Sequence, residues 1–143
     1  MPLAPPPAIV QQLDGVKPID RFTSLPAPIV GGNFSVDGVS AAGWKMAEPG
    51  GAFSATDVPV PNAPARRLIF AACDPKFCLL HYERGGVAHI YLILALSQTN
   101  AGWKAIWEAV GPKPLANLDA MRALVRHPST NNGWTQQWVK GDF

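Results

Sequence analysis

RRLIFAACDPKFCLLHYERGGVAHIYLILALSQTNAGWKAIWEAV, residues 66–110, is the stretch that decides the fold of this chain. Apolar runs of strand length alternate in it with short clusters of Gly, Pro, Asp and Asn. β-branched and aromatic runs bounded by such clusters are the usual signal of strands and turns. The stretch therefore predicts four antiparallel strands, at about 66–72, 78–84, 87–97 and 102–110.

The connections between these strands follow from the residues in them. Gly85-Gly86 supplies the positive φ angles of a two-residue hairpin turn. In that register Arg84 opposes Val87, and side chains alternate between the faces of the sheet. One face is then predicted to hold Leu80, Tyr82, His89 and Tyr91, and the other Leu79, His81, Ile90 and Leu92.

The flanking segments complete a single domain, residues 1–143. With 48% hydrophobic and 15% charged residues, the chain is long and apolar enough for its own core. We expect an α+β fold with an antiparallel sheet of about five strands in residues 44–110. Residues 1–43 form a Pro/Gly-rich N-terminal wrap, and residues 111–143 a helix and tail.

Helical spacing follows the last predicted strand. Apolar residues recur at Leu115, Leu118, Met121, Leu124 and Val125, after Pro114 and before Pro128. Proline suits the first helical turn and ends a helix that it follows. We expect an amphipathic helix over residues 115–126 on one face of the sheet, with the N-terminal wrap near the other face.

Charge and hydropathy exclude two classes of partner. The net charge of +2 comes from scattered Lys and Arg, with no run beyond Arg66-Arg67, so nucleic acid is not expected. No run reaches the 18 or more apolar residues of a membrane span. The N-terminus shows no signal peptide, which fits a mature secretory protein or a cytosolic one. Two Cys across a turn favour an oxidising compartment, so we expect a periplasmic or secreted protein.

The loop from Cys73 to Cys78 is the first candidate site. A disulfide across it would remove roughly 2 kcal/mol of unfolded-chain entropy, and Pro75 fixes one φ angle. A loop stiffened in this way is preorganised for insertion into a cleft. Its tip would display Asp74, Lys76 and Phe77. The alternative is a disulfide that only staples a hairpin.

Other chemistry at the same residues has a weaker basis. Cys73, Cys78, His81 and His89 have the ligand types of zinc, but in the predicted register the two histidines point to opposite faces. Cys78 with a nearby His could form a nucleophile–base pair, although no feature that would lower a thiol pKa is recognisable. The usual nucleotide, hydrolase and metalloprotease motifs are missing from the sequence. We therefore expect no catalytic residues, no metal and no cofactor.

Histidine and tryptophan have structural interpretations beside functional ones. His81, His89 and His127 are each more typical of sheet and helix-end positions than of ligands. The tryptophans could form a carbohydrate-stacking surface, since Trp103 and Trp107 would share one face of a strand. Packing in the core is the simpler interpretation. The tryptophans are residues 44, 103, 107, 134 and 138.

A family resemblance enters at the cysteine loop. Leu68–Ala72 leads into Cys73-Asp74-Pro75-Lys76-Phe77-Cys78, Gly50-Gly51 precedes it, and the hairpin at Gly85-Gly86 and the strand with Trp103 follow. This order resembles the Ivy family of periplasmic inhibitors of vertebrate (C-type) lysozyme, which carries a Cys-x-Pro-x-x-Cys loop between a strand and a hairpin. The resemblance spans about residues 44–110.

The resemblance implies a fold and an action. Members have an antiparallel sheet with helices and a disulfide-closed loop, and often form dimers, so it also implies a homodimer. The loop enters the lysozyme cleft and meets two catalytic carboxylates. Where the family has histidine and then aspartate, this chain has Lys76 and Phe77. Targets other than vertebrate lysozyme are thus also expected: a bacterial muramidase, a lytic transglycosylase or a toxin delivered to the periplasm.

The sequence therefore predicts a protein that inhibits a lysozyme-like, peptidoglycan-cleaving enzyme and is not itself an enzyme. In the target-binding loop, Lys76 would face catalytic carboxylates, Phe77 would fill an apolar subsite, Asp74 would lie on the rim and Pro75 would stiffen the tip. The alternative is an envelope binding, immunity or structural module with no lysozyme inhibition.

Overall fold

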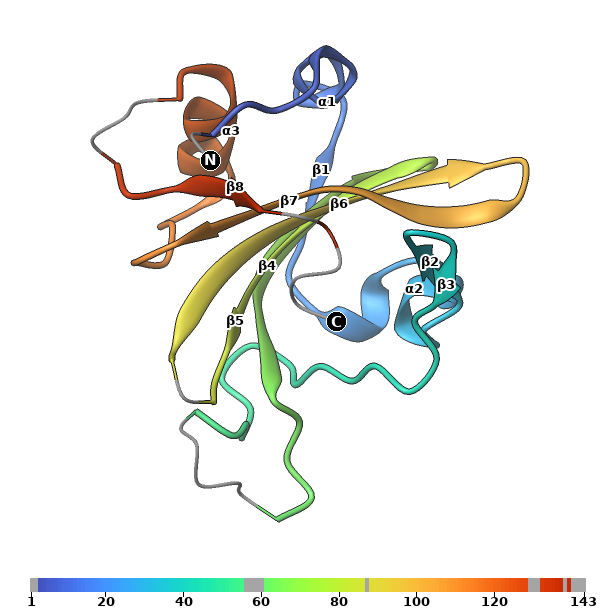
Figure 1. The fold of residues 1–143 in the computed structure, drawn as a ribbon, viewed down its shortest axis with the longest axis vertical. Coiled ribbons are helices and arrows are strands. Elements are labelled where there is room, and N and C mark those ends of the chain that lie inside the picture. The colour runs from blue at the N-terminus through green and yellow to red at the C-terminus, as the bar shows by residue number, and fades with distance from the viewer. Residues whose placement is uncertain (1–2, 56–60, 87, 129–131, 138, 140–143) are drawn as a thin grey trace.

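The fold is taken from a computed structural model that describes residues 3–55, 61–86, 88–128, 132–137 and 139. Its described residues form one eight-stranded sheet with strand order β1-β4-β5-β6-β7-β2-β3, and β8 lies beside β7 (Figure 1). The strands are β1 Lys17–Ile19, β2 Phe34–Val36, β3 Val39–Ser40, β4 Arg66–Asp74, β5 Phe77–Arg84, β6 Ile90–Thr99, β7 Gly102–Gly111 and β8 Thr135–Gln137. The helices are α1 Pro7–Gln12, η1 Phe22–Ser24, α2 Ala27–Val30 and α3 Leu118–Arg126.

The α+β class and the central antiparallel meander are confirmed. The four predicted strands correspond to β4, β5, β6 and β7, and each pairs antiparallel with the next. The prediction of about five strands was too low, because β1, β2, β3 and β8 are only two or three residues long. Strands this short carry no readable alternation, and Pro18 interrupts the sequence of β1.

The register between β5 and β6 differs from the predicted one. Arg84 opposes Ile90 rather than Val87, so residues 85–89 form the connection instead of Gly85-Gly86 alone. This shift of three residues exchanges the faces of β6 relative to β5. Leu92 therefore lies on the Leu80 side, whereas Tyr91 lies on the opposite side.

Position 85 requires glycine because the backbone of residues 54–55 approaches it closely, and not because of a tight hairpin turn. A Cβ atom on this residue would lie 1.7 Å from the carbonyl oxygen of Ser54. The Gly85 N–H also donates to the carbonyl of Ala65 at 3.0 Å. The 54–55 segment thus packs directly on the end of β5, and this contact helps to place the connection to β6.

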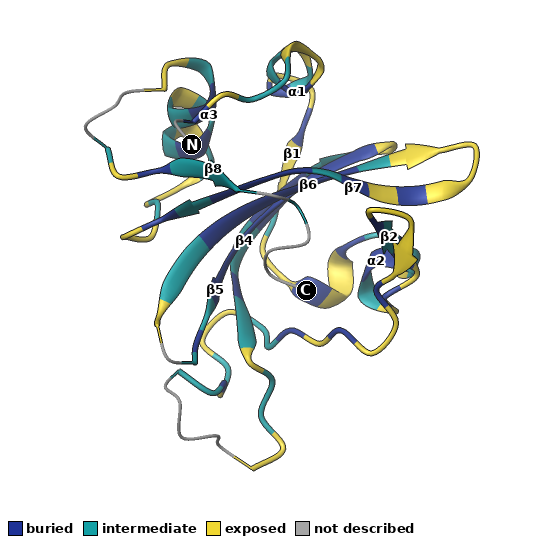
Figure 2. Cartoon of the chain, viewed as in Figure 1, coloured by how far each residue is buried: buried dark blue, intermediate teal, exposed yellow. Residues whose placement is uncertain are grey.

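Both faces of the meander are buried (Figure 2). On one face, which we call the α3-side core, α1 and α3 cover the sheet; on the other, the α2-side core, residues between η1 and Met46 cover it. The N-terminal wrap therefore divides between the two faces. The larger members of the α3-side core are Ile9, Leu13, Phe77, Leu79, Ile93, Trp107, Met121 and Val125, and those of the α2-side core are Phe22, Ile29, Phe34, Trp44, Leu80, Tyr82, Leu92, Leu94 and Trp103.

Helix α3 begins at Leu118, three residues after the predicted start at residue 115. Asn117 caps it, because its side-chain oxygen accepts the Ala120 N–H at 2.8 Å. Arg122 connects the helix to the N-terminal segment by donating to the carbonyl oxygens of Leu13 and Val16, each at 2.8 Å. Helix α3 and the end of α1 are therefore held together over the same face of the sheet.

A β-bulge separates two tryptophans that the sequence placed on one face. The pairing of β6 with β7 shifts where Ala95 opposes Trp107 and Leu96 opposes Ala105, which leaves Ile106 as an extra residue. Trp103 consequently belongs to the α2-side core and Trp107 to the α3-side core. Trp44 and Trp134 are also buried, so the four described tryptophans form no exposed stacking surface; Trp138 lies outside the described residues.

Replacement of Gly85 tests the contact with Ser54. We expect Gly85→Ala to lower the free energy of unfolding by about 2–3 kcal/mol, because the new methyl group must displace backbone atoms. Gly15→Ala is the matched control, since the nearest atom to its Cβ is 3.8 Å away. It should stay within about 0.5 kcal/mol of wild type. Urea denaturation measures both, and equal stability of the two variants would contradict the contact.

Candidate functional site

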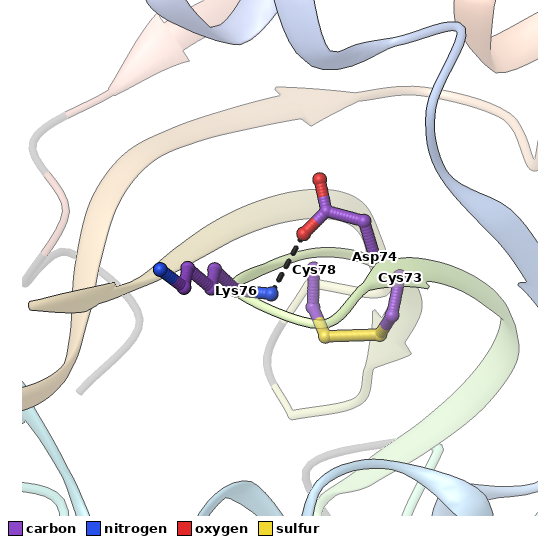
Figure 3. The surroundings of a disulfide bond; sticks show 4 residues. All are labelled: Cys73, Asp74, Lys76 and Cys78. Carbon is purple, nitrogen blue, oxygen red and sulfur yellow. Dashed lines mark hydrogen bonds between the residues drawn. A yellow bond between two sulfur atoms is a disulfide. The ribbon is translucent and has the colours of Figure 1, made fainter.

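The predicted disulfide between Cys73 and Cys78 is present (Figure 3). The two residues oppose each other in the β4–β5 ladder, with Cα atoms 4.1 Å apart. Asp74 and Phe77 form the next pair, so only Pro75 and Lys76 remain to make the turn. The loop is thus a two-residue turn closed by a covalent bond one pair below it.

Hydrogen bonds hold this turn within the sheet. The Lys76 N–H donates to Oδ1 of Asp74 at 2.7 Å, the Asx pattern that stabilises a turn (Figure 3). The Gln98 N–H donates to the Lys76 carbonyl at 2.8 Å, which ties the turn to β6. Because β6 and β7 continue to Thr99 and Gly102, their hairpin reaches beyond the turn. The turn is therefore held rigidly, and the end of the β6–β7 hairpin lies beside it.

The exposure of the loop residues corrects one prediction. Pro75 and Lys76 are exposed and Asp74 is half-buried, but the side chain of Phe77 is completely buried. The prediction that the tip displays Phe77 is wrong, because Phe77 is already a β5 residue on the same face as Leu79. Phe77 anchors the turn in the α3-side core instead.

The charge around the turn is predominantly positive. In the described part of the chain, no ion pair involves Lys76, and Figure 3 shows its side chain extending away from Asp74. Lys17 on β1 opposes Cys73, and Lys104 on β7 opposes Ser97, the residue that pairs with Phe77. Both lysines are exposed. Sequence reasoning missed them because only strand pairing brings them to this end of the sheet.

A hollow of about 460 Å³ lies directly beside the turn. Pro75 and its neighbours line it on one side, and residues of β1 and of the segment around η1 line it on the other. Its walls are mainly apolar. The disulfide itself forms part of the wall through Cys73. The apolar part comes from Ile19, Leu25, Pro26 and Pro75, and Lys17 supplies a cation. A partner that contacts the turn thus also meets this hollow.

The structure does not bring the suggested zinc ligands together. Cys73 and Cys78 are bonded to each other, so neither thiol can bind a metal or act as a nucleophile. No group of three or more His, Cys, Asp or Glu residues with metal-binding geometry occurs within the described ranges. The buried ring of His81 packs against Phe70 and Trp134 on the α3 side of the sheet. His89 lies in the connection between β5 and β6 and contacts Oε1 of Glu83 at 2.8 Å.

The buried His81 links three segments through its two ring nitrogens. Nδ1 lies 2.8 Å from the carbonyl oxygen of Leu92, and Nε2 accepts the N–H of Leu115 at 3.0 Å. These partners fix the neutral tautomer with the proton on Nδ1. Burial lowers the His81 pKa to about 4, although the hydrogen bond to Leu92 and the charge of Glu83 oppose this shift.

A second polar cluster surrounds Glu83 at the opposite end of β5 from the disulfide. Arg67 Nε donates to Glu83 Oε2 at 3.1 Å, and His89 contacts the other carboxylate oxygen. The Arg67 guanidinium lies 4.3 Å from the ring centroid of Phe53 and also donates to the Gly51 carbonyl. These contacts fasten the segment around residues 51–53 to the sheet. No sequence motif predicted these contacts, because Arg67, Glu83 and His89 come from two strands and a connection.

Comparison with known proteins adds no assignment: no family model, no curated protein and no solved structure matches the chain. Among the described residues, none of the helices has the length and apolar character needed to cross a membrane. The geometry of the disulfide-closed turn is therefore the main basis for any functional proposal.

Removal of the disulfide tests how much it stabilises the chain. We expect the Cys73→Ala/Cys78→Ala double variant to lose about 2 kcal/mol of unfolding free energy, the loop-closure entropy of a six-residue loop. Wild type treated with a thiol reductant should lose a similar amount, whereas the double variant should not respond to the reductant. Urea denaturation with and without reductant measures this. An oxidised and a reduced wild type of equal stability would contradict it.

Acid should destabilise the protein through His81. Between an unfolded pKa of 6.5 and a folded pKa of about 4, the unfolded chain binds a proton that the folded one does not. The contribution of the neutral imidazole is fully present above pH 6.5 and is lost as the pH falls. From pH 7.5 to 4.5 this loss is about 2–3 kcal/mol.

A variant that cannot be protonated at position 81 isolates the contribution of His81 to the pH dependence of stability. His81→Asn should be less stable than wild type at pH 7.5 but should lose less stability on acidification. His127→Asn, at an exposed position, should show the wild-type loss. Urea denaturation at the two pH values gives the comparison, and an unchanged loss in His81→Asn would rule out His81 as its source.

Proposed function

We propose that this chain is a periplasmic or secreted protein that binds a lysozyme-like, peptidoglycan-cleaving enzyme and inhibits it with the disulfide-closed turn. The observation that carries the proposal is an exposed lysine, Lys76, on a two-residue turn closed by the Cys73–Cys78 bond. The resemblance to the Ivy family around this loop supports the same target class.

Preorganisation supports binding by this turn. The disulfide, Pro75, the Asp74 side chain and the bond from Gln98 all restrict the turn before a partner arrives. Association costs side-chain and loop ordering, and a turn that is already ordered avoids most of that cost. The rigid part is nevertheless short, so the turn would contact its partner together with the neighbouring end of the β6–β7 hairpin.

The residues of the loop take different parts in the proposed contact. Lys76 places its ammonium against the catalytic carboxylates, where a charge-assisted hydrogen bond contributes more than a neutral one. Pro75 contacts the cleft wall, and Asp74 holds the turn through the Lys76 N–H. Phe77 supports the turn from the core instead of filling a subsite.

Positive charge near the turn supports an acidic partner. Lys17 and Lys104 flank the turn and add to the field of Lys76, whereas Asp74 is the acidic group in the turn itself. A field of one sign at an interface raises the association rate of an oppositely charged cleft. The association rate should therefore fall as the salt concentration rises.

Enzyme inhibition assays test the proposal directly. C-type lysozyme, a bacterial muramidase and a lytic transglycosylase are assayed on peptidoglycan with increasing amounts of the protein. At least one should be inhibited, and Lys76→Ala should raise its inhibition constant by about 10–100-fold through the loss of a charged hydrogen bond.

The control variant is Lys113→Ala. Lys113 is also exposed, but it follows β7 at the end of the sheet away from the turn. Its inhibition constant should stay within about twofold of wild type, as expected for a charge remote from the contact. Inhibition that Lys76→Ala leaves unchanged would remove the turn from the mechanism. Binding to an enzyme without loss of its activity would favour the alternative, an envelope binding, immunity or structural module.

A further inference from the structure

The hollow beside the disulfide-closed turn shares part of its wall with the loop that carries the turn. Cys73, Asp74 and Pro75 line its near side, and residues of β1 and η1 line its far side. The contact proposed above uses Pro75 and Lys76 but no residue of the far side. A protein seated on Pro75 would nevertheless cover the rim of the hollow, so the far side is available for a second contact with the same partner.

The lining favours an apolar occupant. Ile19 and Leu25 line the hollow and pack against the α2-side core, and Pro26 and Pro75 add further apolar surface. The disulfide contributes to the wall through Cys73. A polar side chain that entered would give up its hydrogen bonds to water and find few partners here. An apolar side chain loses nothing of this kind and gains the burial of its surface.

The walls of the hollow are ordered before any partner binds. In η1, the Leu25 N–H donates to the Phe22 carbonyl at 3.1 Å, and the Thr23 N–H donates to the Glu48 carboxylate at 3.3 Å. The near side is held by the disulfide and by the pairing of β4 with β1. Prior ordering on both sides lowers the entropic cost of binding.

Lys17 gives the hollow a charged edge. Lys17 opposes Cys73 in the β1–β4 ladder, so its side chain lies on the same face of the sheet as Cys73. It is exposed, and no ion pair within the described ranges involves it. Asp74 follows Cys73 on β4, so its side chain leaves the sheet on the other face, where it accepts the Lys76 N–H. The cation of Lys17 is thus available to an acidic group of a partner.

We propose that the hollow receives an apolar side chain of the inhibited enzyme, next to a carboxylate of that enzyme that pairs with Lys17. This inference rests on the function proposed above, because the enzyme must first contact the turn. It extends that function by specifying the enzyme surface beside the cleft: a protruding apolar residue with Asp or Glu as its neighbour. A free small molecule fits the hollow less well, because a partner on Pro75 covers the rim that such a molecule would need.

A substitution that fills the hollow tests the apolar contact. Ser24 lines the hollow and is exposed, so Ser24→Trp blocks the space without disturbing a core. Thr23→Trp is the matched control, because Thr23 is the exposed neighbour in η1 and does not line the hollow. Surface plasmon resonance measures binding to whichever of C-type lysozyme, the bacterial muramidase and the lytic transglycosylase is inhibited. Ser24→Trp should raise the dissociation constant about tenfold or more, and Thr23→Trp by no more than about threefold.

The same measurement tests the carboxylate through the rate constants. Loss of a direct ion pair raises the dissociation rate, whereas loss of a remote charge of the same sign lowers mainly the association rate. Lys17→Gln should therefore raise the dissociation rate about tenfold. Lys104→Gln is the control, because Lys104 is exposed and opposes Ser97 away from the hollow, so it should change mainly the association rate. An unchanged dissociation rate in Lys17→Gln would rule out the carboxylate.

The outcomes separate this inference from the function on which it rests. If Lys76→Ala weakens binding but Ser24→Trp binds as wild type does, the hollow is not part of the contact and the inhibitory turn remains. If none of the three enzymes binds, the proposed function fails and this inference fails with it. Anilinonaphthalene sulfonate, a small apolar anion, represents a free ligand. Its binding to wild type but not to Ser24→Trp, without displacement by the enzyme, would assign the hollow to a small molecule and overturn the inference.

Discussion

Burial on both faces is the constraint on which this fold depends. Seven of the eight residues of β5 are buried, and alternate side chains enter different cores, Leu79 on the α3 side and Leu80 on the α2 side. A sheet that is apolar on both faces needs a cover on each. Among the described residues α3 is the longest helix, and Trp134, Val139 and short N-terminal segments add to the cover. Arg122 then joins α3 to one such segment through two backbone carbonyls.

The same constraint determines what the disulfide-closed turn can present. Phe77 belongs to the α3-side core and Cys78 to the α2-side core. The chain is therefore part of the buried sheet from the residue that follows Lys76. Within the loop, only Pro75 and Lys76 are fully exposed to a partner. A longer finger would free more side chains, but it would lose the bond from Gln98 to the Lys76 carbonyl. The turn therefore offers rigidity and one cation instead of a large contact area.

Local signals account for the parts of the structure that could be predicted. The four central strands and the Cys73–Cys78 bond follow from apolar runs and turn residues that are close in sequence. The missed features depend on distant contacts. Next to the β5–β6 connection, Ser54 packs against Gly85 from a distant segment, and the faces of Trp103 and Trp107 depend on a bulge. At the candidate site, the closed turn was predictable, but the burial of Phe77 required the true length of β5.

The register of β4 fixes the position of the disulfide-closed turn. Arg66 begins this strand and Asp74 ends it, next to the turn. Strand β4 is paired with β5 along its length, and near the turn also with β1. A strand paired in this way resists sliding, because a one-residue slip would turn Leu68 and Ala71 out of their core. The sheet therefore holds the turn in place together with the Cys73–Cys78 bond, so the position of Lys76 is determined by contacts far from the turn as well as by the loop itself.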